Sequence, residues 1–201
     1  MEKPEDLQEL ERRLPEIEEI QNRELREEVT RIFIEEVPEY FWDLPASSTG
    51  KYHPSDHNQD HGLWIHTKRA FTAFQRLSRS YDNQGKLNRY EKDCGKAAIL
   101  LHDMFKYGMS PERQEHTVSD HDVIAARFLE KNSDLPEEVI GCVATHNGPR
   151  GWGEGRAPET DLEQIHHLAD MIASDKNGYF KILKPSDELR EYLAHPAHPR
   201  S

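Results

Sequence analysis

The chain has 201 residues, enough for one domain with a substantial core, and 38 acidic against 26 basic side chains give a formal net charge of −12. No apolar run reaches the roughly 18 residues of a membrane span, and the acidic start lacks the features of a signal peptide. We therefore expect a cytoplasmic protein with no membrane partner. The negative charge also argues against the wrapping of long nucleic acid, whose phosphates require a basic face.

An acidic segment opens the chain, since the first 36 residues hold 13 acidic and 6 basic side chains. Apolar residues recur every three or four positions from Ile17 to Phe33, which predicts an amphipathic helix. We expect residues 1–40 to form this N-terminal helical segment and to pack on the core. An exposed apolar side of the helix could pair two subunits into a homodimer. The alternative is an acidic arm that binds another partner.

Helical spacing of apolar residues continues along the rest of the chain. A turn-rich loop at 45–54 is followed by apolar stripes within 63–77, 97–101, 123–129, 139–144 and 162–173, with a second loop, rich in Gly and Pro, at 149–158. No segment alternates with the period of a β-strand. The sequence thus predicts an all-α fold, with its main domain at 41–185. Residues 186–201 would form a helix end and a frayed tail.

The chain holds 12 histidines, and histidine is the commonest metal ligand. Several histidines and aspartates stand beside or at the ends of the apolar stripes: His66, His102, Asp103, His121, His146 and Asp170. Each histidine alone would more often be a hydrogen-bonded core residue. An aspartate among apolar neighbours, as Asp170 is, needs a partner because burial of an unpaired charge is costly. A metal ion would satisfy the whole set.

The pair His102-Asp103 is the most specific part of this pattern. It follows four apolar residues, which predicts a buried helix end where both side chains can reach one ion. A carboxylate can also give one oxygen to each of two ions. Imidazole and carboxylate without thiolate suit a divalent transition metal such as Mn, Fe, Co, Ni or Zn.

The order His66 … His102-Asp103 … Asp170 resembles the H…HD…D signature of the HD superfamily of metal-dependent phosphohydrolases. His121 and His146 resemble the added ligands of its two-metal branch. The segment 45–67 is similar to the start of the HD domain in bacterial 3′→5′ exoribonucleases, although their nucleic-acid-binding domain is missing. The resemblance covers about residues 25–180 and implies a compact HD-domain helical bundle.

This resemblance implies a ligand set and a reaction. One ion would be held by His66, His102, Asp103 and Asp170, and a second by Asp103, His121 and His146. A metal-activated water would then hydrolyse a phosphoester bond of a nucleotide or short oligonucleotide, as a phosphodiesterase or nucleotidase does. Asn147 departs from the pattern, because many two-metal members carry a second histidine there. Phe105 stands where the common HD-x-G-K turn, which ends here in Lys106, has its glycine.

Further candidates surround this set. Lys106 would lie one helical turn beyond the centre and could contact a substrate phosphate, and His61, where the family more often has glycine, could contact substrate or donate a proton. Asp103, Lys106 and His61 are therefore the predicted catalytic residues. Lys51, Arg150 and Arg156 lie in the two loops and are predicted to bind substrate, although surface charge is the ordinary interpretation. Trp152 could stack on a base. Four other histidines could lie at the rim or behind the ligands: His53, His61, His166 and His167. The sequence suggests no role for His57, His116, His195 and His198.

Two other functions remain open at this point. A di-iron oxygenase of the HD fold uses the same ligand order, and a non-catalytic sensor or interaction module could retain the metal site. Metal analysis would identify the oxygenase, and an Asp103→Ala variant that keeps its biological activity would identify the sensor. With a phosphohydrolase, we expect a small nucleotide or phosphodiester as substrate in preference to long nucleic acid.

Overall fold

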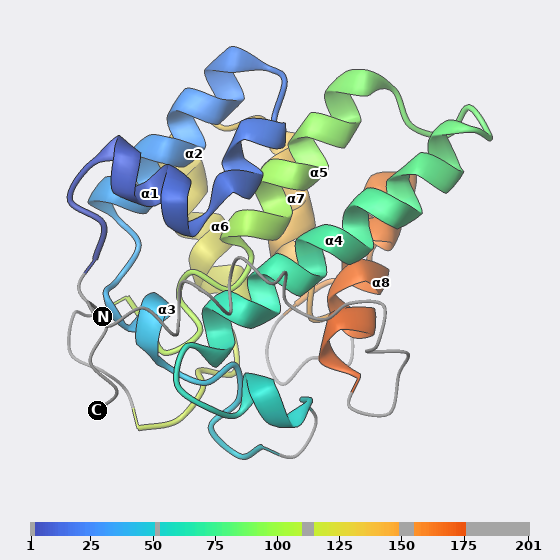
Figure 1. Ribbon diagram of the computed structural model, residues 1–201. Helices are drawn as coiled ribbons and strands as arrows, with labels where there is room; N and C mark the ends of the chain where they lie inside the picture. The colour runs from blue at the N-terminus through green and yellow to red at the C-terminus, as the bar shows by residue number, and fades with distance from the viewer. Residues whose placement is uncertain (1–2, 51–52, 110–114, 149–154, 176–201) are drawn as a thin grey trace.

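Every element in the described part of the computed structural model is a helix (Figure 1), which confirms the all-α class. The structure describes residues 3–50, 53–109, 115–148 and 155–175. The α-helices are α1 (Leu7–Arg13), α2 (Arg23–Glu35), α3 (Tyr40–Asp43), α4 (Gly62–Asp82), α5 (Arg89–Leu101), α6 (His121–Asn132), α7 (Glu137–Thr145) and α8 (Asp161–Ser174). Two short 3₁₀-helices are η1 (Pro15–Glu19) and η2 (Ser55–His57). Within these residues, no helix is long and apolar enough to cross a membrane.

The acidic N-terminal segment is not one helix but three, namely α1, η1 and α2. Pro15 has no backbone N–H and therefore interrupts the helical hydrogen bonds, and Asn22 starts α2 by accepting a hydrogen bond from the backbone of Leu25 at 3.1 Å. The apolar stripe of α2 is buried in the core of the same chain: Leu25, Val29, Ile32 and Phe33. That stripe is consequently not a surface through which two subunits would pair.

The remaining long helices form a bundle in which α4 packs against α5 and α8, while α7 packs against α5, α6 and α8 (Figure 1). The crossing of α4 and α5 is close because Gly95 has no side chain. A Cβ at this position would lie 2.0 Å from the ring of Phe74. This close approach brings the C-terminal end of α5 into the interior beside α4.

An aromatic cluster joins the N-terminal segment to the bundle. The ring of Trp42 lies 6.0 Å from that of Phe33, 5.1 Å from that of Phe41 and 5.7 Å from that of Trp64 in α4, between centroids. Residues on both sides of the predicted boundary at residue 40 therefore share one core. The boundary itself stays a prediction.

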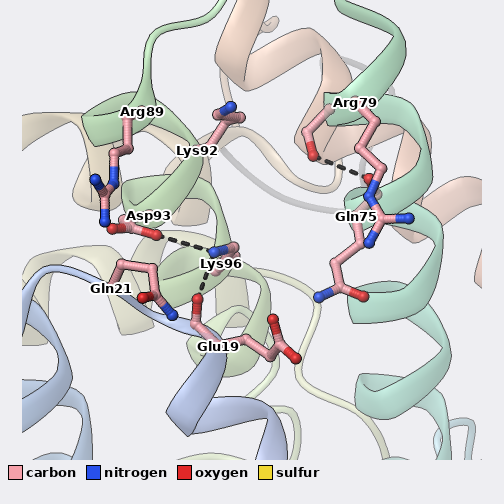
Figure 2. Close-up of a pocket in the computed structure, with 9 residues that line it drawn as sticks. Glu19, Gln21, Gln75, Arg79, Arg89, Lys92, Asp93 and Lys96 are labelled. Atoms are coloured by element: carbon pink, nitrogen blue, oxygen red, sulfur yellow. Dashed lines mark hydrogen bonds and ion pairs between the residues drawn. The ribbon is translucent and has the colours of Figure 1, made fainter. Parts of the chain in front are cut away.

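A cavity of about 310 Å³ lies between η1, α4 and α5 and is lined mainly by charged and polar side chains (Figure 2). Both lysines of this cavity contact nearby oxygens. Lys96 contacts the carboxylate of Asp93 at 3.0 Å and the carbonyl of Glu19, and Lys92 pairs with Asp82 at 2.6 Å. The contact between Lys96 and Glu19 fastens the N-terminal segment to α5, and the cavity is separate from the histidine cluster described next.

Candidate metal centre

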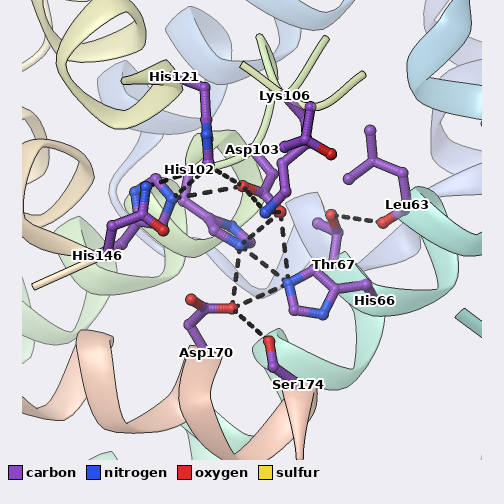
Figure 3. Close-up of polar contacts among 12 residues, drawn as sticks. Leu63, His66, Thr67, His102, Asp103, Lys106, His121, His146, Asp170 and Ser174 are labelled. Carbon is purple, nitrogen blue, oxygen red and sulfur yellow. Dashed lines mark hydrogen bonds and ion pairs between the residues drawn. The ribbon is translucent and has the colours of Figure 1, made fainter. Parts of the chain in front are cut away.

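The structure brings all six predicted ligands together at the centre of the bundle (Figure 3). His66 lies in α4, His102 follows the last residue of α5, Asp103 comes next, His121 begins α6, His146 follows α7, and Asp170 lies in α8. Each is at most 7% exposed. Five helices thus contribute to one buried cluster, although the residues span more than a hundred positions of sequence.

Local sequence explains how two of these helices are positioned. Asn88 and Glu91 form a capping box at the start of α5, and the five residues 97–101 at its end are fully buried. The C-terminal end of α5 therefore places His102 in the interior of the protein. Thr160 and Glu163 form the same kind of box at the start of α8, which leads to Asp170.

The cluster divides into two groups that share Asp103. In the first, His66 Nε2 lies 3.2 Å from His102 Nε2 and 3.0 Å from Asp170 Oδ1. In the second, Asp103 Oδ1 lies 3.0 Å from His121 Nε2 and 3.4 Å from His146 Nε2. The other oxygen of Asp103 faces the first group, at 3.5 Å from both of its imidazoles. Asp103 therefore offers one oxygen to each group.

Backbone carbonyls fix the tautomers of three of these imidazoles. The Nδ1 atoms of His102, His121 and His146 each lie 2.6–2.8 Å from the carbonyl oxygen three residues earlier. A carbonyl only accepts, so each Nδ1 carries a hydrogen, and in the neutral imidazole Nε2 then presents a lone pair. Metal-ligating histidines commonly use this second hydrogen bond.

The second group consequently contains only acceptors. The Nε2 lone pairs of His121 and His146 are 3.2 Å apart and both face the carboxylate of Asp103. Acceptors at such distances repel one another unless a cation lies between them. Metal–nitrogen bonds of about 2.0–2.1 Å would place neighbouring ligand atoms roughly 2.9–3.4 Å apart. The observed separations of 3.0–3.5 Å suit this requirement in both groups, so the donor set fits divalent transition metals.

In the second group, the charges also favour the ligand forms that a metal requires. Burial would raise the pKa of Asp103, but Lys106 and the neighbouring imidazoles hold that pKa well below its usual range. Lys106 Nζ contacts both carboxylate oxygens, at 3.0 and 2.9 Å. Burial and Lys106 lower the pKa of His121. A charged carboxylate and a neutral imidazole are the forms that bind metal.

The other predicted residues are placed differently. His61 directs Nδ1 to the carbonyl of Trp42 at 2.6 Å, and its backbone adopts φ 65°, a region that favours glycine. Arg156 pairs with Glu163 at the start of α8. Neither side chain contacts the six ligands in the described contacts. Lys51, Arg150 and Trp152 lie outside the described residues.

Two buried histidines beside the cluster were missed or left without a definite role. His57 is 0% exposed, and its ring lies 5.3 Å from that of His66 between centroids. His166 is equally buried, with its ring 6.0 Å from that of His102. The spacing of His166 four residues before Asp170 was a usable signal, whereas nothing in the sequence near His57 marks its burial.

Two neighbours support the second group from outside. His167 directs Nδ1 to the backbone carbonyl of His146 at 2.5 Å, which anchors the end of α7 to α8. Asn147, which stands where many two-metal members have histidine, places its amide nitrogen 3.4 Å from His121 Nε2. The side chain at this departure from the family pattern therefore still reaches the second group.

The family model of the HD domain matches residues 63–175, which is more than half of the chain and includes all six ligands. No curated protein and no solved structure matches the chain, and the similarity to exoribonucleases stays a prediction. Family members are, in general, metal-dependent phosphohydrolases, and the histidine–aspartate groups fit metal binding. By this match and this ligand order, the chain belongs to the HD-domain family.

Proposed function

We propose that the protein hydrolyses a phosphoester bond of a nucleotide or short oligonucleotide with one or two divalent ions held by the six residues. The observation that carries this proposal is the convergence of lone pairs in two groups that Asp103 joins. When bound, divalent ions polarise phosphoryl oxygens and lower the pKa of water, which makes hydrolysis possible without a covalent enzyme nucleophile.

Asp103 and Lys106 have distinct parts in this proposal. Asp103 orients both groups because each of its oxygens faces a different one. Lys106 is 8% exposed and lies on the same carboxylate, so its ammonium group is positioned to donate to a phosphoryl oxygen beside the ions. A lysine near the two acidic ligands also offsets part of the negative charge that would repel phosphate.

The overall charge of −12 supports a small substrate in preference to a long polymer. Of the other predicted substrate contacts, Arg156 would have to leave Glu163 to reach phosphate, and His61 would have to leave the carbonyl of Trp42. Lys106 therefore has the strongest structural support among these candidates.

The test is hydrolysis by purified protein loaded in turn with Mn²⁺, Co²⁺, Ni²⁺, Zn²⁺ or Fe²⁺. Substrates would be bis-p-nitrophenyl phosphate and a panel of nucleotides, with identification of the products. Asp103→Asn keeps the shape of the side chain but removes its charge, and we expect activity and bound metal to fall together. Asp134→Asn changes an exposed aspartate and is the matched control.

Two outcomes would refute the proposal. Wild-type activity in a folded Asp103→Asn variant would show that the reaction does not depend on this centre. A mixed-valent iron signal in aerobically purified protein, with no hydrolysis of any phosphoester, would identify the di-iron oxygenase.

A further inference from the structure

Two histidines outside the six ligands pack on His66. The ring of His53 lies 5.1 Å and that of His57 5.3 Å from the ring of His66, between centroids. One nitrogen from each of the three rings lies within 4.8 Å of the others. This geometry could suggest a third metal site, but the contacts of His57 argue for a different use.

Arg69 determines the tautomer of His57. Its guanidinium is 3% exposed, pairs with the carboxylate of Asp56, and places Nη1 2.9 Å from His57 Nε2. A guanidinium has only donors, so His57 Nε2 must be the acceptor. In a neutral imidazole whose Nε2 accepts, the hydrogen is on Nδ1. His57 therefore presents an N–H, and no lone pair, on its other side.

The same reasoning extends from His57 to His53. The two Nδ1 atoms are 3.4 Å apart, a long hydrogen bond. Because His57 Nδ1 carries a hydrogen, His53 Nδ1 is the acceptor, and the hydrogen of His53 must be on Nε2. A metal at the three rings would need a lone pair on His57 Nδ1, which Arg69 removes. The three rings also include no carboxylate to offset the charge of an ion.

We infer that Asp56, Arg69 and His57 hold His53 as a neutral imidazole whose Nε2–H donates to a phosphoryl oxygen of the substrate at the metal centre. This inference rests on the proposed function for the identity of the ligand. His53 is partly exposed, and its ring packs against that of the ligand His66. His53 is thus a substrate-binding residue, whereas His57 and Arg69 are positioning residues.

The first test measures tautomers and needs no activity. Full-length protein with ¹⁵N-labelled histidine rings would be loaded with diamagnetic Zn²⁺ and studied by long-range ¹H–¹⁵N correlation. We expect a hydrogen on Nδ1 of His57 and on Nε2 of His53. Arg69→Met should abolish this preference in both rings, while Arg79→Met, an exposed change on the same helix, should preserve it. Hydrogen on Nε2 of His57, or zinc bound to its Nδ1, would overturn the inference.

The second test uses inorganic phosphate as the probe. Phosphate should shift the Nε2–H resonance of His53, and His53→Phe should weaken phosphate binding about 10- to 100-fold, the size expected for loss of one hydrogen bond to a charged group. His53→Gln keeps an N–H donor and should recover part of the affinity. Metal content should stay at the wild-type level in both variants, which separates a binding role from a structural one.

The two proposals can fail separately. If the protein hydrolyses phosphoesters but phosphate binds His53→Phe as it binds wild type, the role of His53 is wrong and the proposed function stands. If no phosphoester is hydrolysed while the tautomers and the phosphate shift are as expected, the anion-binding role stands and the proposed reaction is wrong.

Discussion

Replacement of Lys106 by Met tests whether the charge of Asp103 needs a cation as its partner, either the lysine or a metal ion. Lys106 Nζ lies 3.0 and 2.9 Å from the two oxygens of Asp103, and these side chains are 10% and 0% exposed. At 3 Å and an effective dielectric constant of about 20, the attraction is about 5.5 kcal/mol. Loss of one partner of a buried pair costs about 3–5 kcal/mol, because the other charge is left without compensation. Met keeps the length of the side chain but removes the charge.

For a chain of 201 residues, each kcal/mol shifts the melting temperature by about 2–4 °C. Lys106→Met should therefore lower the melting temperature by about 6–20 °C in the presence of a chelator. Divalent ions would compensate Asp103 in place of the lysine, so the loss should shrink to a small fraction of that value in saturating Mn²⁺. Thermal unfolding by circular dichroism measures both states.

The matched control is Lys131→Met, which changes an exposed lysine of α6, and its melting temperature should move little in either condition. An equal loss for Lys106→Met with and without metal would refute the reasoning. A loss below about 2 °C in chelator would show that the pair is not a significant source of stability.

Three further predictions concern the metal groups and the packing around them. His146→Ala should reduce the bound metal from two ions to one by mass spectrometry, with the exposed His116→Ala as a control that changes nothing. Burial lowers the pKa of His102 and Asp103 raises it, with a net increase above 6.5. A metal ion must displace the proton that this imidazole holds below its pKa, so the affinity for metal, measured by calorimetry, should fall on acidification and rise with pH. Gly95→Ala should destabilise the fold by about 1–3 kcal/mol in urea unfolding, because the new Cβ would meet the ring of Phe74.

The sequence was most informative where a chemical requirement and helical periodicity coincided. Asp170 stands among apolar residues, and such an aspartate predicts a buried partner, which the structure supplies as His66 and His102. The N-terminal segment was predicted less well, because its apolar stripe from Ile17 to Phe33 continues across the break between η1 and α2, where Asn22 begins a new helix.

The role of His57 could not be predicted from the sequence. Its tautomer depends on Arg69, twelve residues away, and its burial depends on the packing of η2 against the start of α4. Gly62 permits that packing, since a Cβ there would lie 2.0 Å from the carbonyl oxygen of His57. Such contacts are fixed by tertiary structure, and no local pattern of residues reports them.

The position of each ligand within its helix explains how its imidazole is oriented. His102 and His146 follow the last residues of α5 and α7, where carbonyls of the final turn lack helical partners and can accept from Nδ1. His66 lies inside α4, and the carbonyl three residues before it, that of Leu63, already accepts from the hydroxyl of Thr67 at 3.0 Å (Figure 3).

His66 Nδ1 is accordingly buried with no hydrogen-bond partner among the described residues. Its ring must be oriented by packing, and the rings that lie across it are those of His53 and His57. His57, which would position the donor to phosphate, therefore also helps to hold the one ligand whose tautomer the backbone does not fix. Substitution of His57 should consequently weaken metal binding at the first group more than at the second, because the imidazoles of His121 and His146 keep their carbonyl partners.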